Sequence, residues 1–514
     1  MALSKHVNTD KLIQDSHDKK SHYHGLTKSN IHRVEHTYGA RYNTTPIPKY
    51  NIASKGINAD AAYQLIHDEL SLDTDEYPAT QALHTRCVSI IADLWHAPSA
   101  KGAIGTATTG SSEAIQLGGL AMKKMWQEKR KAAGKSIHEP GSYHLSPNIV
   151  MGANAQVALE KFARYFEVEC RLVPVSEESH YRLDPKKAME FVDENTIGVY
   201  VILGSTYTGH YEPVKEMSDY LDEYEAKTGY SVPIHVDAAS GGFIAPFATP
   251  KLQWDFKLPR VVSINTSGHK FGLAYVGVGW VIWRDKAHLP KDLIFELHYL
   301  GSVEYSFSLN FSRPAAPIIA QYFNLIHLGF EGYRAVALDD MKNARLLSRA
   351  LEASKYYTVL SDIHRKVGGP VGAVKGAVGI DDEDIESYVP GLPVVSFRFS
   401  DAYKQKHPEV QQRWIQTLLR AKGWIVPNYE LPPALQQVEI LRVVIRESMT
   451  EVLVDQLVAD IIEITEGLAK EGSSAHSLTA LGQAQHKRNR AEQTEGSLKE
   501  GSGSKSSGTY AKTC

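Results

Sequence analysis

A lysine in a small-residue turn is the first feature of the chain that could do chemistry. Residues 263–272 read SINTSGHKFG, so that a strand-like run ends in a turn that carries Lys270 next to His269. A lysine amine held by a tight turn at a strand end can form a Schiff base with an aldehyde. Taken alone the motif is weak, because most lysines of a protein lie on its surface.

A carboxylate closes an earlier strand-like run, in the segment His235-Val-Asp237-Ala-Ala-Ser-Gly-Gly. A buried acid is costly unless it meets a cation or a ligand. Capping of the following helix is the other interpretation of this aspartate. About one βα unit plus a strand separates Asp237 from Lys270, which predicts that both lie at the same edge of one sheet. In open α/β sheets this edge, at the carboxyl ends of the strands, holds the ligand.

A third motif, Thr108-Thr-Gly-Ser111-Ser112, opens a helix-like segment. Free N–H groups at a helix start, together with two hydroxyls, form an anion site; simple helix capping explains the same residues. Pyridoxal phosphate needs a lysine for its aldehyde, an acid for its ring nitrogen and a helix start for its phosphate. The three motifs together therefore predict this cofactor.

The elements that must position these residues form an α/β pattern. Six apolar runs are separated by helix-length stretches, which is typical of a mostly parallel sheet covered on both faces; they are Asn148–Gly152, Arg171–Val175, Ile197–Leu203, Val232–Asp237, Val261–Asn265 and Val276–Trp283. Two later runs, Pro393–Phe399 and Val438–Ile445, indicate a smaller α/β unit. We predict an N-terminal arm (1–50), a large cofactor-binding domain (51–340), a small C-terminal domain (341–470) and a disordered tail (471–514).

Composition excludes several classes of function. The 514 residues include 56 Lys and Arg against 59 Asp and Glu, a net charge of −3, so the overall charge predicts neither nucleic-acid nor anionic-membrane binding. Three cysteines without a CxxC pair predict neither a disulfide framework nor a zinc site, and fit a reducing compartment. No secretory or membrane-spanning stretch is visible. We therefore expect a cytoplasmic protein with no metal site.

At this point the chain resembles the glutamate decarboxylases, pyridoxal-phosphate enzymes of the group II decarboxylase family. The resemblance runs from about Tyr50 to Lys470 and rests on long motifs, among them TGSSEAIQLGGLAMK, HVDAASGGFIAPF and SGHKFGLAYVGVGWVIWRD. It implies the aspartate-aminotransferase-type fold (fold type I), with a large mostly parallel sheet domain and a smaller C-terminal α/β domain. It also implies a carboxy-lyase that converts L-glutamate to 4-aminobutanoate (GABA) and CO₂.

The resemblance assigns roles to matching positions. Lys270 would bind the cofactor covalently, Asp237 would pair with the pyridine nitrogen, and Thr206 would lie near the cofactor hydroxyl. Two residues would lie against the ring, Ala239 and Gln156. Phosphate contacts would come from Ser111, Ser112, Ser267 and His269, and from Ser312 of a neighbouring subunit. This shared contact implies a homodimer, and the family's use of the N-terminal arm in assembly makes a hexamer plausible.

The same resemblance assigns two residues to the substrate. Arg442 would hold a substrate carboxylate with the bidentate geometry of a guanidinium; a structural ion pair is the other interpretation. Tyr299 precedes a segment that looks like the family's mobile flap, and it could help to protonate the product.

The chain departs from the family between Asp73 and Thr74. The phrase AYQLIHDELSLD is followed at once by TDEYPATQALHTRC, whereas family members carry a substantial stretch between them. That stretch helps to form the pocket for the distal carboxylate of glutamate and part of the subunit interface. Three interpretations are open: an exon is missing from the sequence, the protein is a true short form, or another segment such as Thr45–Lys49 substitutes.

This departure leaves three functions to weigh. The first is an active glutamate decarboxylase. The second is a decarboxylase of another small amino acid, and the third is a catalytically poor, cofactor-binding subunit that acts with a full-length partner.

The C-terminal tail carries a basic run, His486-Lys-Arg-Asn-Arg490, without a nearby tryptophan. A calmodulin target needs bulky anchors at helical spacing, so calmodulin binding is not predicted.

Overall fold

The computed structural model describes residues 50–71, 73, 77–98, 104–135, 137, 147–297, 304–367 and 387–471. Its α-helices are α3 Ala59–Leu70, α4 Pro78–Leu94, α5 Ser111–Ala132, α6 Val157–Tyr165, α7 Pro185–Ala188, α8 Val214–Thr228, α9 Ala245–Ala248, α10 Ala316–Ala353, α12 Asp401–Lys406, α13 Arg413–Ala421 and α14 Glu451–Glu471. Its strands are β1 Ile104–Thr108, β2 Asn148–Gly152, β3 Glu169–Val173, β4 Thr196–Ile202, β5 Ile234–Asp237, β6 Val261–Ser267, β7 Gly279–Trp283, β8 Phe295–Leu297, β9 Glu304–Ser306, β10 Tyr357–Val359, β11 Val394–Phe399, β12 Asn428–Glu430 and β13 Glu439–Val444.

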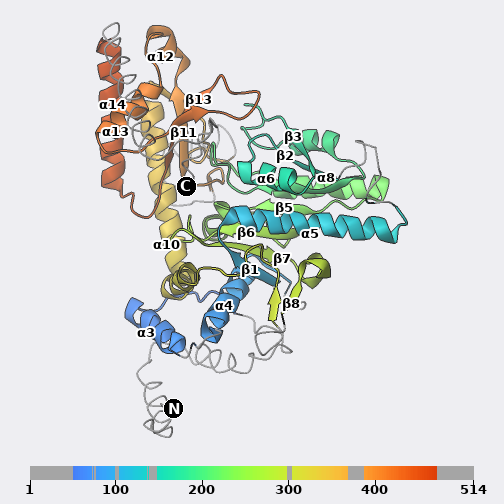
Figure 1. Cartoon of the computed structure of the whole chain (residues 1–514). Helices are drawn as coiled ribbons and strands as arrows, with labels where there is room; N and C mark the ends of the chain where they lie inside the picture. Colours follow the sequence, from blue (N-terminus) through green and yellow to red (C-terminus); the bar gives the residue numbers. More distant parts are fainter. Residues whose placement is uncertain are drawn as a thin grey trace, which may run out of the picture.

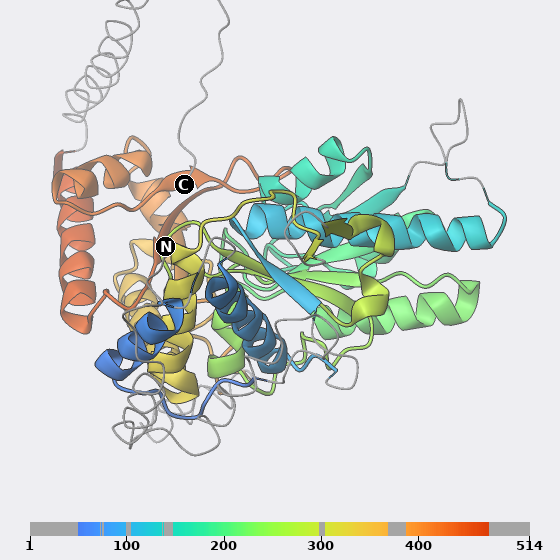
Figure 2. The ribbon, with the colours of Figure 1, turned by 60° about the horizontal axis from the view of Figure 1, so that its bottom comes forward.

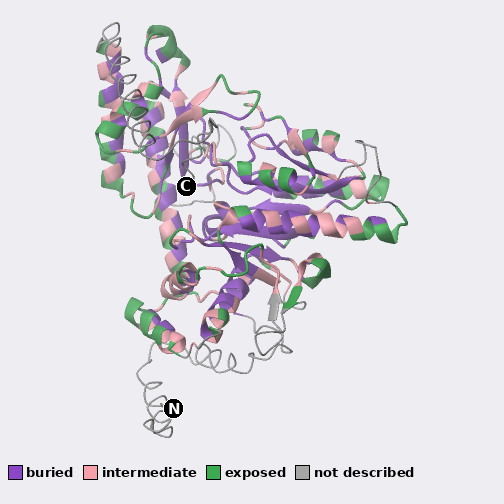
Figure 3. Ribbon diagram, viewed as in Figure 1, coloured by how far each residue is buried: buried purple, intermediate pink, exposed green. Residues whose placement is uncertain are grey.

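A seven-stranded sheet in the order β1-β7-β6-β5-β4-β2-β3 forms the centre of the molecule (Figure 1). Strand β7 runs antiparallel to both of its neighbours, β1 and β6, and the other pairs are parallel. The inner strands β2, β4, β5, β6 and β7 are buried along their whole length (Figure 3). Burial on both faces explains why they read as continuous apolar runs.

Helices cover both faces of this sheet. On one face, α5 and α6 pack against side chains such as Ile149, Tyr200 and Ile202. On the other face, α4, α8 and α10 share a larger core with Val199, Val201 and Val236. Alternate residues of β4 therefore point into different helical layers, as the two-residue period of a strand requires.

A second sheet, in the order β10-β11-β13-β12, is antiparallel throughout. The 38-residue helix α10 runs from the large sheet to this smaller one and bends at Gly329, which has a φ of 61°. Figures 1 and 2 both show α10 beside the α13–α14 layer at one end of the molecule. The smaller unit is therefore joined to the larger one by two helical segments that meet at the bend at Gly329.

The junction that lacks the family stretch is closed by polar contacts between α3 and α4. Arg86 of α4 donates two hydrogen bonds of 2.6 Å to the carboxylate of Glu69 in α3. Asp73 accepts from the backbone N–H groups of Ala79 and Thr80 and from the Thr80 hydroxyl, and so caps the start of α4. The two helices therefore pack together across the short connection.

The α/β prediction is confirmed, and each of the six strand-like runs overlaps a strand of the large sheet. The sequence did not predict β1, and the antiparallel direction of β7 is a departure from a purely parallel sheet. Helix α10 crosses residue 340, so the predicted boundary at this point stays a prediction. The arm before Tyr50 and the tail after Glu471 lie outside the described residues. Among the described helices, none combines the length and the apolar character needed to cross a bilayer.

Replacement of Arg86 by methionine is predicted to destabilise the fold. The guanidinium is 2% exposed, and its loss leaves the Glu69 carboxylate, 14% exposed, without its cation. Breaking a buried ion pair from one side costs about 3–5 kcal/mol. We expect a lower denaturation midpoint in urea for R86M. The exposed pair of Lys215 and Asp219 on α8 is the matched control, and K215M should change stability by about 0.5 kcal/mol or less. Equal midpoints for R86M and K215M would contradict the prediction.

Candidate cofactor site

Lys270 lies in the turn that follows β6, at the carboxyl edge of the large sheet. Its amine donates to the hydroxyl of Ser240, at 3.3 Å, in the turn that follows β5. Burial lowers the pKa of Lys270; the carboxylate of Asp237 opposes this shift and the guanidinium of Arg442 adds to it. A lowered pKa leaves more of the amine in its neutral, nucleophilic form.

A narrow cavity at this sheet edge brings together five residues predicted for the site. They are Gln156, Thr206, Asp237, Ala239 and Lys270, and the lining is completed by Asn154, Ile202, Gly204 and Ser240. The lining comes from the ends of β2, β4, β5 and β6. This is the position at which open α/β sheets bind their ligands.

Asp237 is the buried acid of the cavity, with 4% of its surface exposed. Its Oδ1 accepts hydrogen bonds from the backbone N–H of Ala239, at 3.1 Å, and from Nδ2 of Asn265, at 2.9 Å. Both of these bonds end on Oδ1, so Oδ2 can accept from a ligand. A protonated ring nitrogen is a group that suits such a carboxylate, and the acid therefore fits pyridoxal phosphate.

The start of α5 fits a phosphate. The helix is 22 residues long, and its first backbone hydrogen bond runs from Ala114 to Gly110, which leaves the N–H groups before it for an anion. The hydroxyls of Ser111 and Ser267 lie 2.7 Å apart, so the turn meets the end of β6. Gly110 has a φ of 155°, a conformation that side-chain-bearing residues rarely adopt.

His269 and Ser112 lie on either side of this turn. Nδ1 of His269 is hydrogen-bonded to the carbonyl of Val278 at 2.8 Å, and burial lowers the pKa of the imidazole. A carbonyl can only accept, so Nδ1 carries the proton and Nε2 is the free nitrogen of the neutral ring. Ser112 is exposed at the first turn of α5.

Arg442 of β13 reaches from the small sheet to the cavity edge. One terminal nitrogen donates to the backbone carbonyl of Thr206, and the guanidinium carbon lies 5.8 Å from the centre of the Tyr429 ring. Its Nε is buried without a hydrogen-bond partner among the described residues. An unsatisfied buried N–H is costly, and a ligand carboxylate would remove that cost.

Ser312 does not line the cavity. Ser312 is exposed on the segment before α10. Tyr299 lies outside the described residues, so its predicted role in proton transfer stays a prediction. Sequence reasoning also missed Asn265, whose amide donates to Asp237. A signal was present, because both strands carry polar residues two positions apart: Ser263 and Asn265 on one strand, and His235 and Asp237 on the other.

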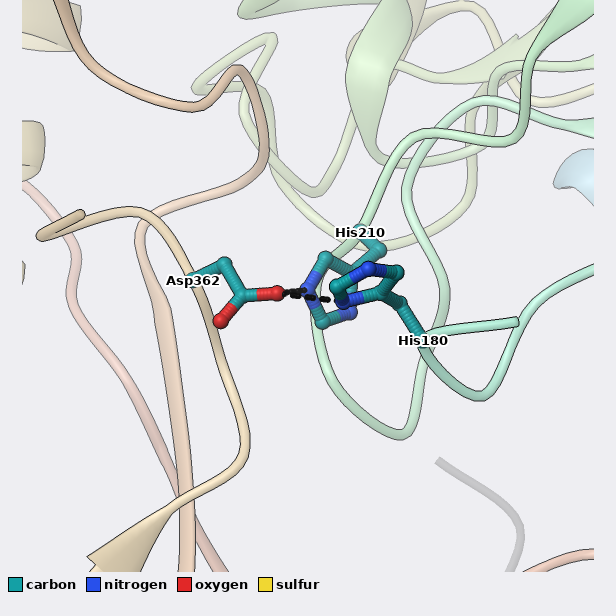
Figure 4. Close-up of side chains that lie close together, drawn as sticks. All are labelled: His180, His210 and Asp362. Atoms are coloured by element: carbon teal, nitrogen blue, oxygen red, sulfur yellow. Dashed lines mark hydrogen bonds and ion pairs between the residues drawn. The ribbon is translucent and has the colours of Figure 1, made fainter. Parts of the chain in front are cut away.

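A separate polar cluster lies where the loops after β3 and β4 meet the small unit. His180 and His210 both contact Oδ2 of Asp362, at 2.8 and 2.9 Å (Figure 4). Three such side chains could in principle hold a metal ion. However, Arg365 bonds to Oδ1 of the same carboxylate at 2.8 Å, and the charge of Arg182 acts on His210. We therefore interpret the cluster as a hydrogen-bonded junction between the two units.

Comparison with known proteins agrees with the predicted cofactor. Residues 54–368 match the model of the pyridoxal-dependent decarboxylase conserved domain. The chain is 45% identical over 468 residues to a glutamate decarboxylase of Saccharomyces cerevisiae, covering 81% of this chain and 78% of that protein. It is 43% identical over 501 residues to glutamate decarboxylase 1 of Arabidopsis thaliana, covering 91% and 92%. A solved structure of Lactobacillus brevis glutamate decarboxylase superposes with a TM-score of 0.69 at 35% identity, covering 87% and 94%.

Capture of pyridoxal phosphate by the cofactor-free protein is predicted to depend on pH through Lys270. The neutral amine reacts, so the rate should rise with pH and level off once the lysine is deprotonated. Because burial lowers the pKa of Lys270, the midpoint of this rise should lie below the pH of about 10.4 at which an exposed lysine titrates. Stopped-flow absorbance measures the rate, and Lys270→Ala is the control that should show no covalent capture. A midpoint equal to that of free lysine would contradict the prediction.

Proposed function

The chain belongs to the pyridoxal-dependent decarboxylase family, and we propose that it removes the α-carboxylate of L-glutamate to give 4-aminobutanoate and CO₂. The observation that carries the proposal is the cavity lined by Lys270 and Asp237, together with the contact between Ser111 and Ser267 that brings the start of α5 to the end of β6. Relatives named glutamate decarboxylase, at 36–45% identity over most of the chain, support glutamate as the substrate.

The cofactor supplies a ring that accepts the electron pair left behind when CO₂ departs. Lys270 would hold the cofactor aldehyde through its amine. Asp237 would stabilise positive charge on the ring nitrogen from a buried position. Ala239, Gln156 and Thr206, which line the cavity, would contact the ring and its hydroxyl. The hydroxyls of Ser111, Ser112 and Ser267, the imidazole of His269 and the N–H groups of α5 would hold the phosphate.

Arg442 is the residue that we assign to the substrate. Its guanidinium already donates to the Thr206 carbonyl at the cavity edge, and its unpaired Nε faces no competing acceptor among the described residues. A carboxylate that it holds is fixed in orientation as well as in position, because the guanidinium is planar and rigid. Tyr299 is assigned to protonation of the product carbon by resemblance alone.

A second candidate function follows from the junction between α3 and α4. L-Glutamate carries two carboxylates, and Arg442 can neutralise one of them. The described residues that line the cavity include no arginine, and Arg442 reaches only its edge through the Thr206 carbonyl. If no other segment supplies the partner of the distal carboxylate, the same chemistry would act on a smaller amino acid, or the chain would bind the cofactor without efficient turnover.

The assembly that we propose is a homodimer, and a hexamer is compatible with it. Ser312 is exposed, and its neighbours Leu309 and Phe311 expose 45% and 58% of their surface. Tyr275 and Val276, which follow the Lys270 turn, expose 85% and 69%. Exposed apolar side chains close to a cofactor site are typical of a surface that a second subunit covers.

Two free cysteines, Cys87 and Cys170, support a cytoplasmic location.

Release of CO₂ from L-glutamate by the purified, cofactor-loaded protein tests the substrate. We expect release from L-glutamate above release from L-aspartate, L-tyrosine or L-tryptophan, with the visible spectrum of the bound cofactor recorded alongside. A bound cofactor with no release from L-glutamate would refute the proposed substrate and favour the second candidate. A chain that binds no cofactor would contradict the site itself.

Replacement of Arg442 by lysine is predicted to raise KM for the substrate by about 10- to 100-fold. Lysine keeps the charge but loses the bidentate geometry, and a charge-assisted hydrogen bond contributes about 1.5–3 kcal/mol. Initial rates over a range of substrate concentrations measure the effect. Arg413, exposed on α13, provides the control R413K, which should leave KM unchanged. An unchanged KM in R442K would favour the structural interpretation of Arg442.

A further inference from the structure

A chain of buried hydrogen bonds leads away from Asp237 on the side opposite the cavity. Parallel pairing places His235 of β5 opposite Ser263 of β6, and Asp237 opposite Asn265. Residues two apart on a strand share a face, so these four side chains form one polar layer. Ser263, His235 and Asn265 have no exposed surface at all.

The direction of each hydrogen bond in this layer is fixed by the last acceptor. The NH₂ group of Asn265 donates to Oδ1 of Asp237, 2.9 Å away. The amide oxygen of Asn265 then faces Nε2 of His235, at 2.7 Å, and needs a donor there. Nε2 therefore carries the proton, and Nδ1 accepts from the Ser263 hydroxyl at 2.7 Å. One arrangement of protons satisfies all three contacts.

The surroundings keep the imidazole of His235 neutral and in place. Burial lowers the pKa of His235 well below its usual range. The ring of Tyr200 meets it edge-on, with 5.1 Å between the ring centres. Helix α5 passes so close at Gly118 that a Cβ there would lie 2.4 Å from Cε1 and Nδ1 of the imidazole. The glycine is required at this point because His235 fills the space that a side chain would occupy.

We propose that His235 and Asn265 are positioning residues that hold the Asp237 carboxylate toward the ring nitrogen of the cofactor. The Asn265 amide keeps Oδ1 occupied and so directs Oδ2 into the cavity, and His235 prevents that amide from rotating. If these residues only stabilised the core, apolar side chains would serve as well. The hydrogen bonds of buried polar groups do little more than offset the cost of removing those groups from water. The inference rests on the cofactor assignment and not on which amino acid is decarboxylated.

The test compares two cofactors on the cofactor-free protein. Pyridoxal phosphate carries the ring nitrogen, and its 1-deaza analogue carries a CH group in its place. Their dissociation constants are measured by fluorescence titration, without turnover. The wild type should bind pyridoxal phosphate at least tenfold more tightly than the analogue. His235→Phe and Asn265→Leu should bring this ratio close to one by weakening pyridoxal phosphate alone, and Gly118→Ala should do the same by displacing the imidazole.

Two controls separate positioning from structure. Tyr200→Phe removes a buried hydroxyl that bonds to the Ile115 carbonyl in the same layer but outside the chain to Asp237, and it should leave the ratio unchanged. His235→Gln can still donate to Asn265, so it should restore most of the preference. Circular dichroism checks that each variant is folded.

The outcomes are distinct. If His235→Phe and Asn265→Leu weaken both cofactors equally, or leave the ratio as in the wild type, the positioning role is overturned. If the wild type does not distinguish the two cofactors, the role of Asp237 is overturned and that of its supports with it. Failure to release CO₂ from L-glutamate would not affect the ratio, so it refutes only the proposed substrate.

Discussion

The parallel pairing of β5 with β6 is the interaction on which the site depends. It delivers Asp237 and the turn that carries Ser240 from one strand, and Ser267 and Lys270 from its neighbour. Adjacent strands lie about 4.8 Å apart, so the acid, the amine and one phosphate ligand are brought within reach of a single small molecule without any loop having to fold over it. Helix α5 begins at the same edge of the sheet, because the hydroxyl of its first residue, Ser111, contacts the hydroxyl of Ser267.

Much of this arrangement could be predicted from the sequence, because buried parallel strands have a plain signature. The run at 197–203 is apolar on both faces, and the observed strand lies within one residue of it. Strand β1, with the residues Ile-Gly-Thr-Ala-Thr, carries too little apolar character to stand out. The antiparallel direction of β7 could not be seen, since an apolar run reads the same either way.

The predicted site residues divide in the same physical way. Those on strand ends were predictable from the chain, because strand direction and the switch from strand to turn fix their place. Contacts between the two units were not predictable in this way. Arg442 and the Thr206 carbonyl lie far apart in the sequence, and only the resemblance to the family indicated that Arg442 belongs to the site. Asn265 was missed for a different reason. The predicted strand ends at Asn265, whereas the observed strand continues to Ser267, so the Asn265 amide lies within the sheet with no exposed surface.

The loop after β4 connects the cavity with the small unit. The carbonyl of Thr208 accepts from the Ser361 hydroxyl, that of Gly209 accepts from the backbone of Leu392, and His210 contacts Asp362. Thr206 belongs to the same loop and lines the cavity. A shift of the small unit would therefore move the wall of the cavity and the guanidinium of Arg442 together, so that the two keep their relative positions.

Glu113, buried in the first turn of α5, accepts hydrogen bonds from two separate segments, the turn before α5 and the segment that leads to α10. Its Oε2 accepts from the N–H and hydroxyl of Thr109 in the phosphate turn, and its Oε1 accepts from the N–H groups of Leu309 and Asn310. The second segment leads to Ser312 and to the exposed apolar side chains around it. One carboxylate thus orders both segments. A ligand that ordered the turn at the start of α5 would therefore favour any contact that ordered the exposed segment, and by reciprocity the second event would favour the first to the same degree.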